Sequence, residues 1–239
     1  MARVGLMLYT IREECAKDLH GALRSVAEMG YEGVEMFTLH GHDPKTVAGW
    51  LRDLGLAAAG RHAGLEQIED ELPALADEAR ALGWSRLVLA GLDPAMLGDE
   101  GWPVRLGRAA EEAAAHGLRL GYHNHDAEIR TGFLERLPES VFLEIDLGWT
   151  WWAGADPVEV LERFRGRVPL VHVKDFRDRE THSFAPVGDG AIDYARVAPA
   201  AVAAGVEWLL VEQDQCNRPA LEAVRRSRDA LRSAVGGFA

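Results

Sequence analysis

The stretch VPLVHVKDF, residues 168–176, alternates apolar and polar side chains in the manner of a barrel strand. In an extended chain Val171 and Val173 point to one side, whereas His172 and Lys174 point to the other. A strand of a closed parallel barrel turns its outer face to surrounding helices, and its inner face becomes polar near the carboxyl end. The stretch therefore predicts a barrel strand whose last polar side chains enter a functional site.

The same type of run recurs along the chain, alternating with amphipathic stretches that predict helices, for example over 18–30, 156–166 and 218–235. The helix after the fifth run is the weakest, and we expect it over 132–138. The expected strands span residues 4–9, 33–37, 57–62, 86–91, 118–123, 141–146, 168–173 and 208–213. Strict strand–helix alternation predicts a parallel sheet, and eight units in 239 residues predict one (β/α)8 TIM barrel domain over 1–239.

Composition excludes several classes of protein. The net charge of −12 and the pI near 5.2 disfavour binding to nucleic acid or to anionic membranes. Cys15 and Cys216 lie far apart, which argues against a disulfide framework and fits a reducing compartment. The sequence shows no secretory pattern and no apolar run of membrane-spanning length, so we expect a soluble cytoplasmic protein.

Residues able to bind a metal occur late in four successive strands: His123, Asp146, His172 and Glu212. A single residue of this kind is more often a hydrogen-bonded or ion-paired structural group. Their coincidence on one polar face favours a metal site, because imidazole and carboxylate ligands together suit Mn²⁺, Zn²⁺, Co²⁺ or Fe²⁺. Such an ion polarises a sugar carbonyl. We therefore predict one divalent ion held by these four residues.

Other polar and aromatic residues at the strand ends are candidates for contact with a sugar. They are Tyr9, Glu35, His62, Glu144 and Trp149. Trp149 opens the cluster WTWW (149–152), and its ring suits the C–H surface of a sugar, although packing of a helix is the alternative. The loop VGDG (187–190) fits either a phosphate-gripping loop or a simple turn, and the turn is favoured.

The motifs YHNHDAE (122–128) and HVKD (172–175), followed by VGDGAIDY (187–194) and WLLVEQD (208–214), resemble the sugar phosphate isomerase/epimerase family of xylose-isomerase-like TIM barrels. The resemblance covers nearly the whole chain. It implies a single divalent ion, often Mn²⁺, with Glu, Asp, His and Glu as ligands. Asp146, His172 and Glu212 match the last three positions, and His123 stands at the first. Homodimers are common among such barrels, so the resemblance also implies a possible homodimer.

Two departures from the family pattern affect the expected mechanism. His123 replaces a glutamate that moves protons in epimerase members, and Trp149 replaces a histidine. Glu212 remains as a base, and the second proton relay falls to His125, Glu128 or Lys174. A neutral imidazole adds no negative charge, which makes the ion a stronger Lewis acid and favours enolisation. Enolisation serves both isomerisation and β-elimination.

We therefore expect a metal-dependent isomerase or epimerase that removes a proton next to the carbonyl of a keto-sugar or cyclitol. The alternative is a lyase or dehydratase acting on a keto-sugar or inosose. A DNA-repair endonuclease would need several metal ions and a basic groove, which the net charge of −12 disfavours. A non-catalytic sugar-binding barrel is disfavoured because three of the four family ligands are retained.

Overall fold

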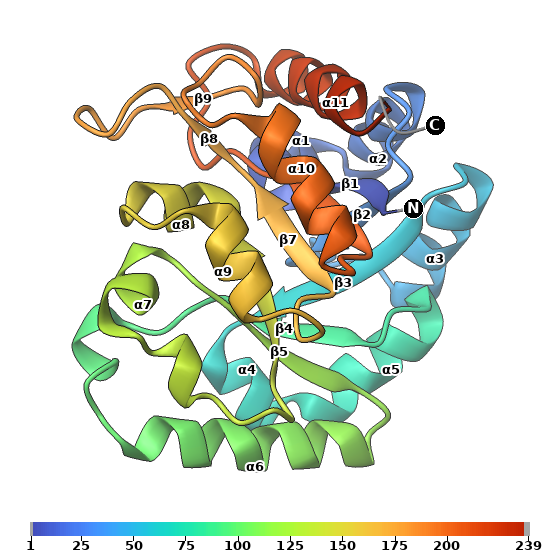
Figure 1. Cartoon of the computed structure of the whole chain (residues 1–239). Helices are drawn as coiled ribbons and strands as arrows, with labels where there is room; N and C mark the ends of the chain where they lie inside the picture. Colours follow the sequence, from blue (N-terminus) through green and yellow to red (C-terminus); the bar gives the residue numbers. More distant parts are fainter. Residues whose placement is uncertain (1, 237–239) are drawn as a thin grey trace.

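Eight parallel strands pair edge to edge into a closed barrel in the computed structural model, which describes residues 2–236 (Figure 1). They are β1 Arg3–Met7, β2 Gly33–Met36, β3 Ala57–Ala63, β4 Arg86–Leu89, β5 Arg119–His123, β6 Phe142–Asp146, β7 Leu170–Val173 and β10 Trp208–Val211. Strand β10 pairs with both β7 and β1 and so closes the barrel. Every expected strand overlaps one of these, which confirms the prediction of a TIM barrel.

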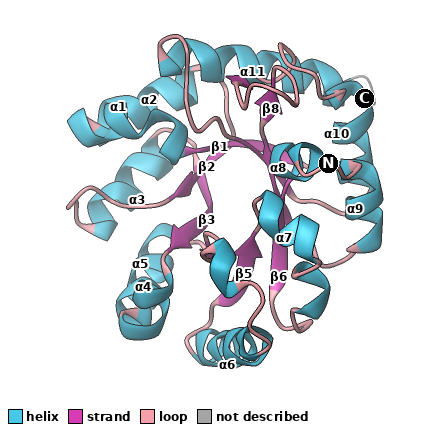
Figure 2. Ribbon diagram, turned by 90° about the vertical axis from the view of Figure 1, so that its left-hand side faces the viewer, coloured by secondary structure: helices cyan, strands magenta, loops and turns pink. Residues whose placement is uncertain are grey.

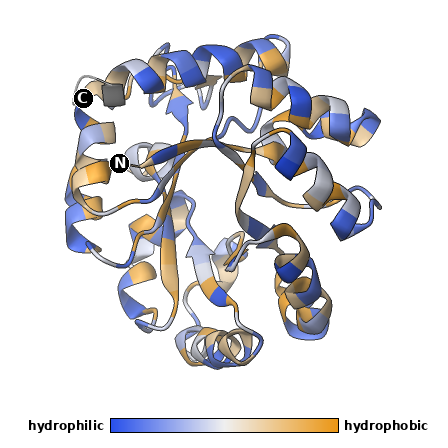
Figure 3. Cartoon of the chain, turned by 90° about the vertical axis from the view of Figure 1, so that its right-hand side faces the viewer, coloured by the Kyte–Doolittle hydropathy of each residue, from blue (hydrophilic) through white to orange (hydrophobic). Residues whose placement is uncertain are grey.

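Helices form a ring around the strands, as Figure 2 shows. They are α1 Arg12–Lys17, α2 Leu19–Glu28, α3 Pro44–Asp53, α4 Leu65–Asp70, α5 Leu72–Leu82, α6 Gly101–Ala115, α7 Asp126–Thr131, α8 Leu147–Trp152, α9 Pro157–Arg163, α10 Tyr194–Ala203 and α11 Ala220–Gly236. Hydrophobic and hydrophilic residues share these helices (Figure 3). In α2 the side chains of Leu19, Leu23 and Val26 are buried, as expected from their helical spacing. Within residues 2–236, no helix has the length and apolarity to cross a membrane.

The helix after β5 is not where the sequence places it. Helix α7 spans Asp126–Thr131, whereas residues 132–138 contain only the short 3-10 helix Leu134–Arg136. The helix begins early because the carboxylate of Glu128 accepts a hydrogen bond from the backbone N–H of His125. It ends at Gly132, whose φ of 65° lies in the left-handed region that favours glycine.

A two-stranded hairpin, β8 Asp175–Phe176 and β9 Phe184–Ala185, follows β7 and was not expected from the sequence. The carboxylate of Asp175 accepts hydrogen bonds from the backbone N–H groups of Phe176, Gly188, Gly190 and Ile192. The amides of the VGDG loop thus surround a carboxylate of their own chain. This arrangement favours the turn interpretation over a phosphate-gripping loop.

The amino end of the barrel interior is filled by a hydrophobic plug. It consists of Ala59, Val88, Phe142, Leu170, Trp208 and Leu210. Trp208 requires glycine opposite it, because a Cβ on Gly33 would lie 2.5 Å from the indole Cη2 atom. The plug leaves the polar side chains at the carboxyl end of the barrel, above a dry floor.

Candidate active site

A cavity of about 520 Å³ lies at the carboxyl ends of the strands. Its walls include side chains predicted for a site, among them His62, His123, His125, Lys174 and Glu212. The volume is large enough for a monosaccharide or cyclitol, and the position is where TIM barrels carry their active sites.

The four predicted metal ligands lie close together at the base of this cavity, which His123 and Glu212 line directly. We call them the outer group: His123, Asp146, His172 and Glu212. One ligand atom from each lies within 4.8 Å of the others, and all four side chains are buried. His172 Nδ1 lies 2.8 Å from Glu212 Oε2, and His123 Nε2 lies 3.8 Å from Asp146 Oδ2. The residues come from the ends of β5, β6, β7 and β10, as the alternation predicted. Their role as ligands remains a prediction.

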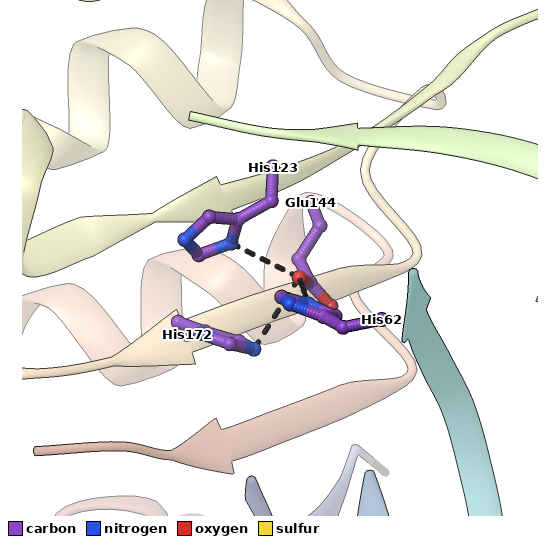
Figure 4. Close-up of side chains that lie close together, drawn as sticks. All are labelled: His62, His123, Glu144 and His172. Atoms are coloured by element: carbon purple, nitrogen blue, oxygen red, sulfur yellow. Dashed lines mark hydrogen bonds and ion pairs between the residues drawn. The ribbon is translucent and has the colours of Figure 1, made fainter. Parts of the chain in front are cut away.

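Beneath the outer group lies a second set of polar side chains, the inner group, made of Glu35, His62 and Glu144. Glu144 Oε2 is 2.5 Å from His62 Nε2, 3.0 Å from His123 Nδ1 and 3.3 Å from His172 Nε2 (Figure 4). Glu35 and Glu144 are fully buried. Of the three residues, His62 lines the cavity and the two glutamates do not. Contact between His62 and a substrate therefore remains a prediction. The positions of Glu35 and Glu144 do not support such a contact for them.

Burial controls the ionisation of this region. It lowers the pKa of His62 to about 4 and the pKa of His123 well below its usual range. Burial, together with the charge of Glu144, raises the pKa of Glu35 to about 7. For His172, burial acts to lower the pKa, but Glu144 and other nearby carboxylates outweigh it and raise the pKa well above the usual range. The two low-pKa imidazoles are neutral at pH 7, the form in which histidine binds metals.

Lys174 places a buried ammonium group beside the outer group. Its Nζ atom lies 3.0 Å from Asp146 Oδ2, 2.9 Å from Glu212 Oε2 and 3.0 Å from Asp214 Oδ2. Burial alone would lower the pKa of Lys174, but Asp146, Glu212 and Asp214 raise it above the usual lysine range. Lys174 is therefore a cation held by three carboxylates.

The outer group has the properties of a divalent cation site. Asp146 Oδ2 is buried and has no hydrogen-bond partner among the described residues. It forms ion pairs with Lys174 Nζ at 3.0 Å and with His123 Nε2 at 3.8 Å. His172 Nε2 lies 2.7 Å from Glu35, and its other nitrogen lies 2.8 Å from Glu212, so a proton joins His172 and Glu212 in the metal-free protein. Loss of that proton would free both atoms as metal ligands. Two imidazoles and two carboxylates form a donor set that suits Zn²⁺, Co²⁺, Fe²⁺ or Mn²⁺. The residues present therefore fit the predicted ion.

His125 and Glu128 occupy different positions although both belong to the YHNHDAE motif. The His125 ring faces the cavity. The carboxylate of Glu128 is buried; it accepts hydrogen bonds from the Tyr122 hydroxyl (2.7 Å) and from the backbone N–H of His125 (3.0 Å). The structure thus places Glu128 behind His125, where it fixes the start of α7.

Trp149 packs mainly against other aromatic rings. Its ring centroid lies 5.7 Å from that of His125 and 5.3 Å from that of Phe176. Its backbone N–H is capped by Asp146 Oδ1 at 2.8 Å. Within residues 2–236 the cavity walls do not include Trp149, so the packing alternative describes its position, and its contact with a sugar remains a prediction.

The rim of the cavity contains residues that the sequence reasoning singled out and residues that it missed. Tyr9 lines the cavity from the 3-10 helix Leu8–Ile11 and is 39% exposed. Gln67 and Gln215 also line it but carried no signal, because a lone glutamine near a strand end has no distinctive spacing. Their amides can donate to and accept from hydroxyl groups.

Comparison with known proteins agrees with this geometry. A protein named inosose dehydratase from Geobacillus kaustophilus (strain HTA426) is 26% identical over 243 residues, covering 81% of this chain and 79% of the relative. A sugar phosphate isomerase/epimerase structure from Parabacteroides distasonis ATCC 8503 superposes with a TM-score of 0.80 at 21% identity, covering 98% and 97% of the two chains. The structure of an IOLI protein with a bound zinc atom has a TM-score of 0.77 at 15% identity and covers 99% of each chain. The model of the xylose isomerase-like TIM barrel family matches residues 23–234, and the chain belongs to that family.

Proposed function

We propose that this protein is a metal-dependent enzyme that removes a proton from the carbon next to the carbonyl of an uncharged keto-cyclitol or keto-sugar and then eliminates water. The observation that carries the proposal is the meeting of the outer group with His125 and Lys174 in one cavity of about 520 Å³. Ligands, proton carriers and room for a six-membered ring occur together there.

The charges around the cavity favour an uncharged substrate. Arg61 is buried, pairs with Glu78 at 3.0 Å and donates to the carbonyls of Phe37 and His62. Arg12, on the cavity wall, donates to the carbonyls of Tyr9 and Asp214. Lys174 is surrounded by three carboxylates. The divalent ion and Lys174 are balanced by Asp146, Glu212 and Asp214, so the floor of the site offers a phosphate dianion no excess positive charge. Hydroxyl groups can bind the carboxylates and the amides of Gln67 and Gln215.

The residues have distinct proposed roles. His123, Asp146, His172 and Glu212 hold the ion, which would polarise the substrate carbonyl and so acidify the neighbouring C–H bond. Glu212 reaches the cavity and is placed to accept the proton. His125 and Lys174, on other walls of the cavity, are placed to give a proton to the departing hydroxyl group. In a dehydration the C–H proton and the β-hydroxyl group leave together as water, and a carbon–carbon double bond conjugated to the carbonyl forms.

Dehydration is the first candidate because the curated relative is named inosose dehydratase and because His123 replaces the second glutamate base that epimerase members use. Elimination needs one base for carbon and one acid for oxygen, which matches Glu212 with His125 or Lys174. Isomerisation is the second candidate. It is supported by two proton carriers, His125 and Lys174, lining the same cavity as Glu212.

The test begins with metal content, measured by elemental analysis of wild type and of Asp146→Ala. We expect about one divalent ion per chain, lost in the variant. The loaded protein is then incubated with an inosose in deuterated water. Dehydration gives a product lighter by one water, with enone absorption in the ultraviolet; isomerisation gives unchanged composition with deuterium at the exchanged carbon. Loaded protein that does neither, with keto-cyclitols or with keto-sugars, would rule out the proposed reaction.

A further inference from the structure

The geometry points to a positioning role for the inner group: Glu144 and Glu35 hold the rings of His123 and His172 so that the opposite nitrogen of each ring binds the divalent ion. This inference rests on the proposed function, because it assumes that the ion lies in the outer group. It assigns a purpose to two fully buried glutamates that the proposed reaction itself does not use.

His123 shows the arrangement first. Its Nδ1 atom lies 3.0 Å from Glu144 Oε2, and its Nε2 atom faces Asp146 Oδ2 at 3.8 Å. If Nδ1 donates its proton to Glu144, the lone pair remains on Nε2, on the side of the outer group. The carboxylate therefore selects the tautomer that coordinates a metal there.

His172, two strands away on β7, repeats the arrangement with its two nitrogens exchanged. Nε2 lies 2.7 Å from Glu35 Oε2, and Nδ1 lies 2.8 Å from Glu212 Oε2. Again one nitrogen faces a buried inner carboxylate and the other faces an outer-group oxygen. Histidine ligands of metals usually donate their second ring N–H to a carboxylate or a carbonyl, which fixes the ring and raises its basicity.

His62 connects the two glutamates. Its Nε2 atom lies 2.5 Å from Glu144 Oε2 and 3.4 Å from Glu35 Oε2, and its ring stacks on that of His172 with an interplanar angle of 3°. A single side chain thus fixes both carboxylates and one of the two ligand rings. The inner group is a connected support, which is how buried polar groups hold a defined geometry.

The rival position for the ion is among His62, His123, Glu144 and His172, whose donor atoms also lie within 4.8 Å of one another. Such an ion would take Nδ1 of His123 and Nε2 of His172, and the outer group would lose both imidazole ligands. Both sets contain buried residues and two residues of the cavity wall, so burial does not distinguish them. The outer group supplies two carboxylates to a divalent ion, whereas the rival set supplies one, and this charge balance favours the outer group.

The experiment measures the affinity of the full chain for Co²⁺ by competition with a chelating indicator, together with the visible absorption spectrum of the loaded protein. Glu144→Gln and Glu35→Gln keep the side-chain volume and remove the charge. We expect both variants to bind one ion per chain about 10- to 100-fold more weakly than wild type, with a changed visible spectrum. Glu207→Gln is the matched control: it removes a carboxylate that faces Arg86 at the amino ends of the strands, away from both groups, and it should keep wild-type values.

Wild-type affinity and spectrum in both variants would overturn the inference. Loss of the ion in Glu144→Gln with retention in Asp146→Asn would also overturn it, because the ion would then lie in the inner group. Glu144 contacts both His123 and His172, and Glu35 contacts His172, so each variant removes support from at least one ligand ring and either suffices if the other fails to fold. Wild-type protein that binds one ion but converts no keto-cyclitol or keto-sugar would refute the proposed function alone. Wild-type protein that binds no ion would refute both.

Discussion

Lys174 and Asp146 form a buried ion pair at the floor of the cavity, with Nζ 3.0 Å from Oδ2. The ammonium group would repel the divalent ion that Asp146 and Glu212 are proposed to bind, because it lies close to both carboxylates. Lys174 also lines the cavity. Lys174→Met removes the charge but keeps the length of the side chain. We expect this variant to bind Co²⁺ more tightly than wild type, because the repulsion is gone, and to lose turnover about 100-fold or more, because a proton carrier is gone.

The control is Lys17→Met, which removes an exposed lysine at the end of α1. A Lys174→Met protein that no longer binds the metal would show that Lys174 supports the ion rather than competing with it. Binding and turnover are measured on the same preparation, so the two effects separate.

His125 lines the cavity while lying outside both groups of candidate ligands. We therefore expect His125→Ala to keep its metal content and to lose kcat by about 100-fold, the usual contribution of a proton carrier. Glu128→Gln keeps an acceptor for the Tyr122 hydroxyl and loosens the start of α7, so its loss of kcat should be smaller than that of His125→Ala. An equal loss in both variants would instead give Glu128 a direct part in the chemistry.

Asp175 satisfies four backbone N–H groups, two buried and two partly buried, and this predicts a large effect on stability. Asp175→Ala leaves those donors without partners, so we expect the free energy of unfolding to fall by about 3 kcal/mol or more in urea denaturation. Asp178→Ala is the comparison, because Asp178 accepts from Glu180 and Thr181 in a more exposed turn. Its loss should stay below about 1 kcal/mol.

Gly148 in α8 packs directly against the backbone of Lys174, the residue that follows β7. A Cβ there would lie 2.6 Å from the carbonyl oxygen and 2.8 Å from the Cβ of Lys174. Gly148→Ala should therefore cost about 1–3 kcal/mol of stability and lower kcat by displacing Lys174. Gly49→Ala in α3 is the matched helical control, since the nearest atom to its new Cβ is Arg52 Nη2 at 3.8 Å. It should be neutral or should stabilise the protein by up to about 1 kcal/mol.

The alternation of eight strands with helices predicted the barrel, and the polar–apolar alternation within strands predicted the meeting of the outer group. His172 and Lys174 lie on the inward face of β7 and beyond its end, where the sequence placed them. The helix after β5 was misplaced because the bond between Glu128 and the His125 backbone, which starts α7 at Asp126, was not recognised as a capping signal. The β8–β9 hairpin was missed because strands of two residues leave no periodicity.

Depth inside the barrel could not be predicted from the sequence. Glu35, His62 and Glu144 were expected beside the substrate because they occur late in their strands. Depth, however, depends on the stagger between neighbouring strands, and the pairing of β2 with β3 contains a register shift at Val34/Glu35. The contact between Glu35 and His172, 137 positions apart, follows from closure of the barrel rather than from any local pattern.

The hydrophobic plug around Trp208 closes the interior of the barrel at its amino end. Substrate enters, and product and any water formed leave, through the same cavity opening at the carboxyl ends of the strands, where Tyr9 and His125 lie. Product and substrate therefore cannot occupy the site together, and each turnover ends only when the mouth has been cleared. For the proposed enzyme this makes the product a competitive inhibitor, and it couples the rate of exit to the rate of the next entry.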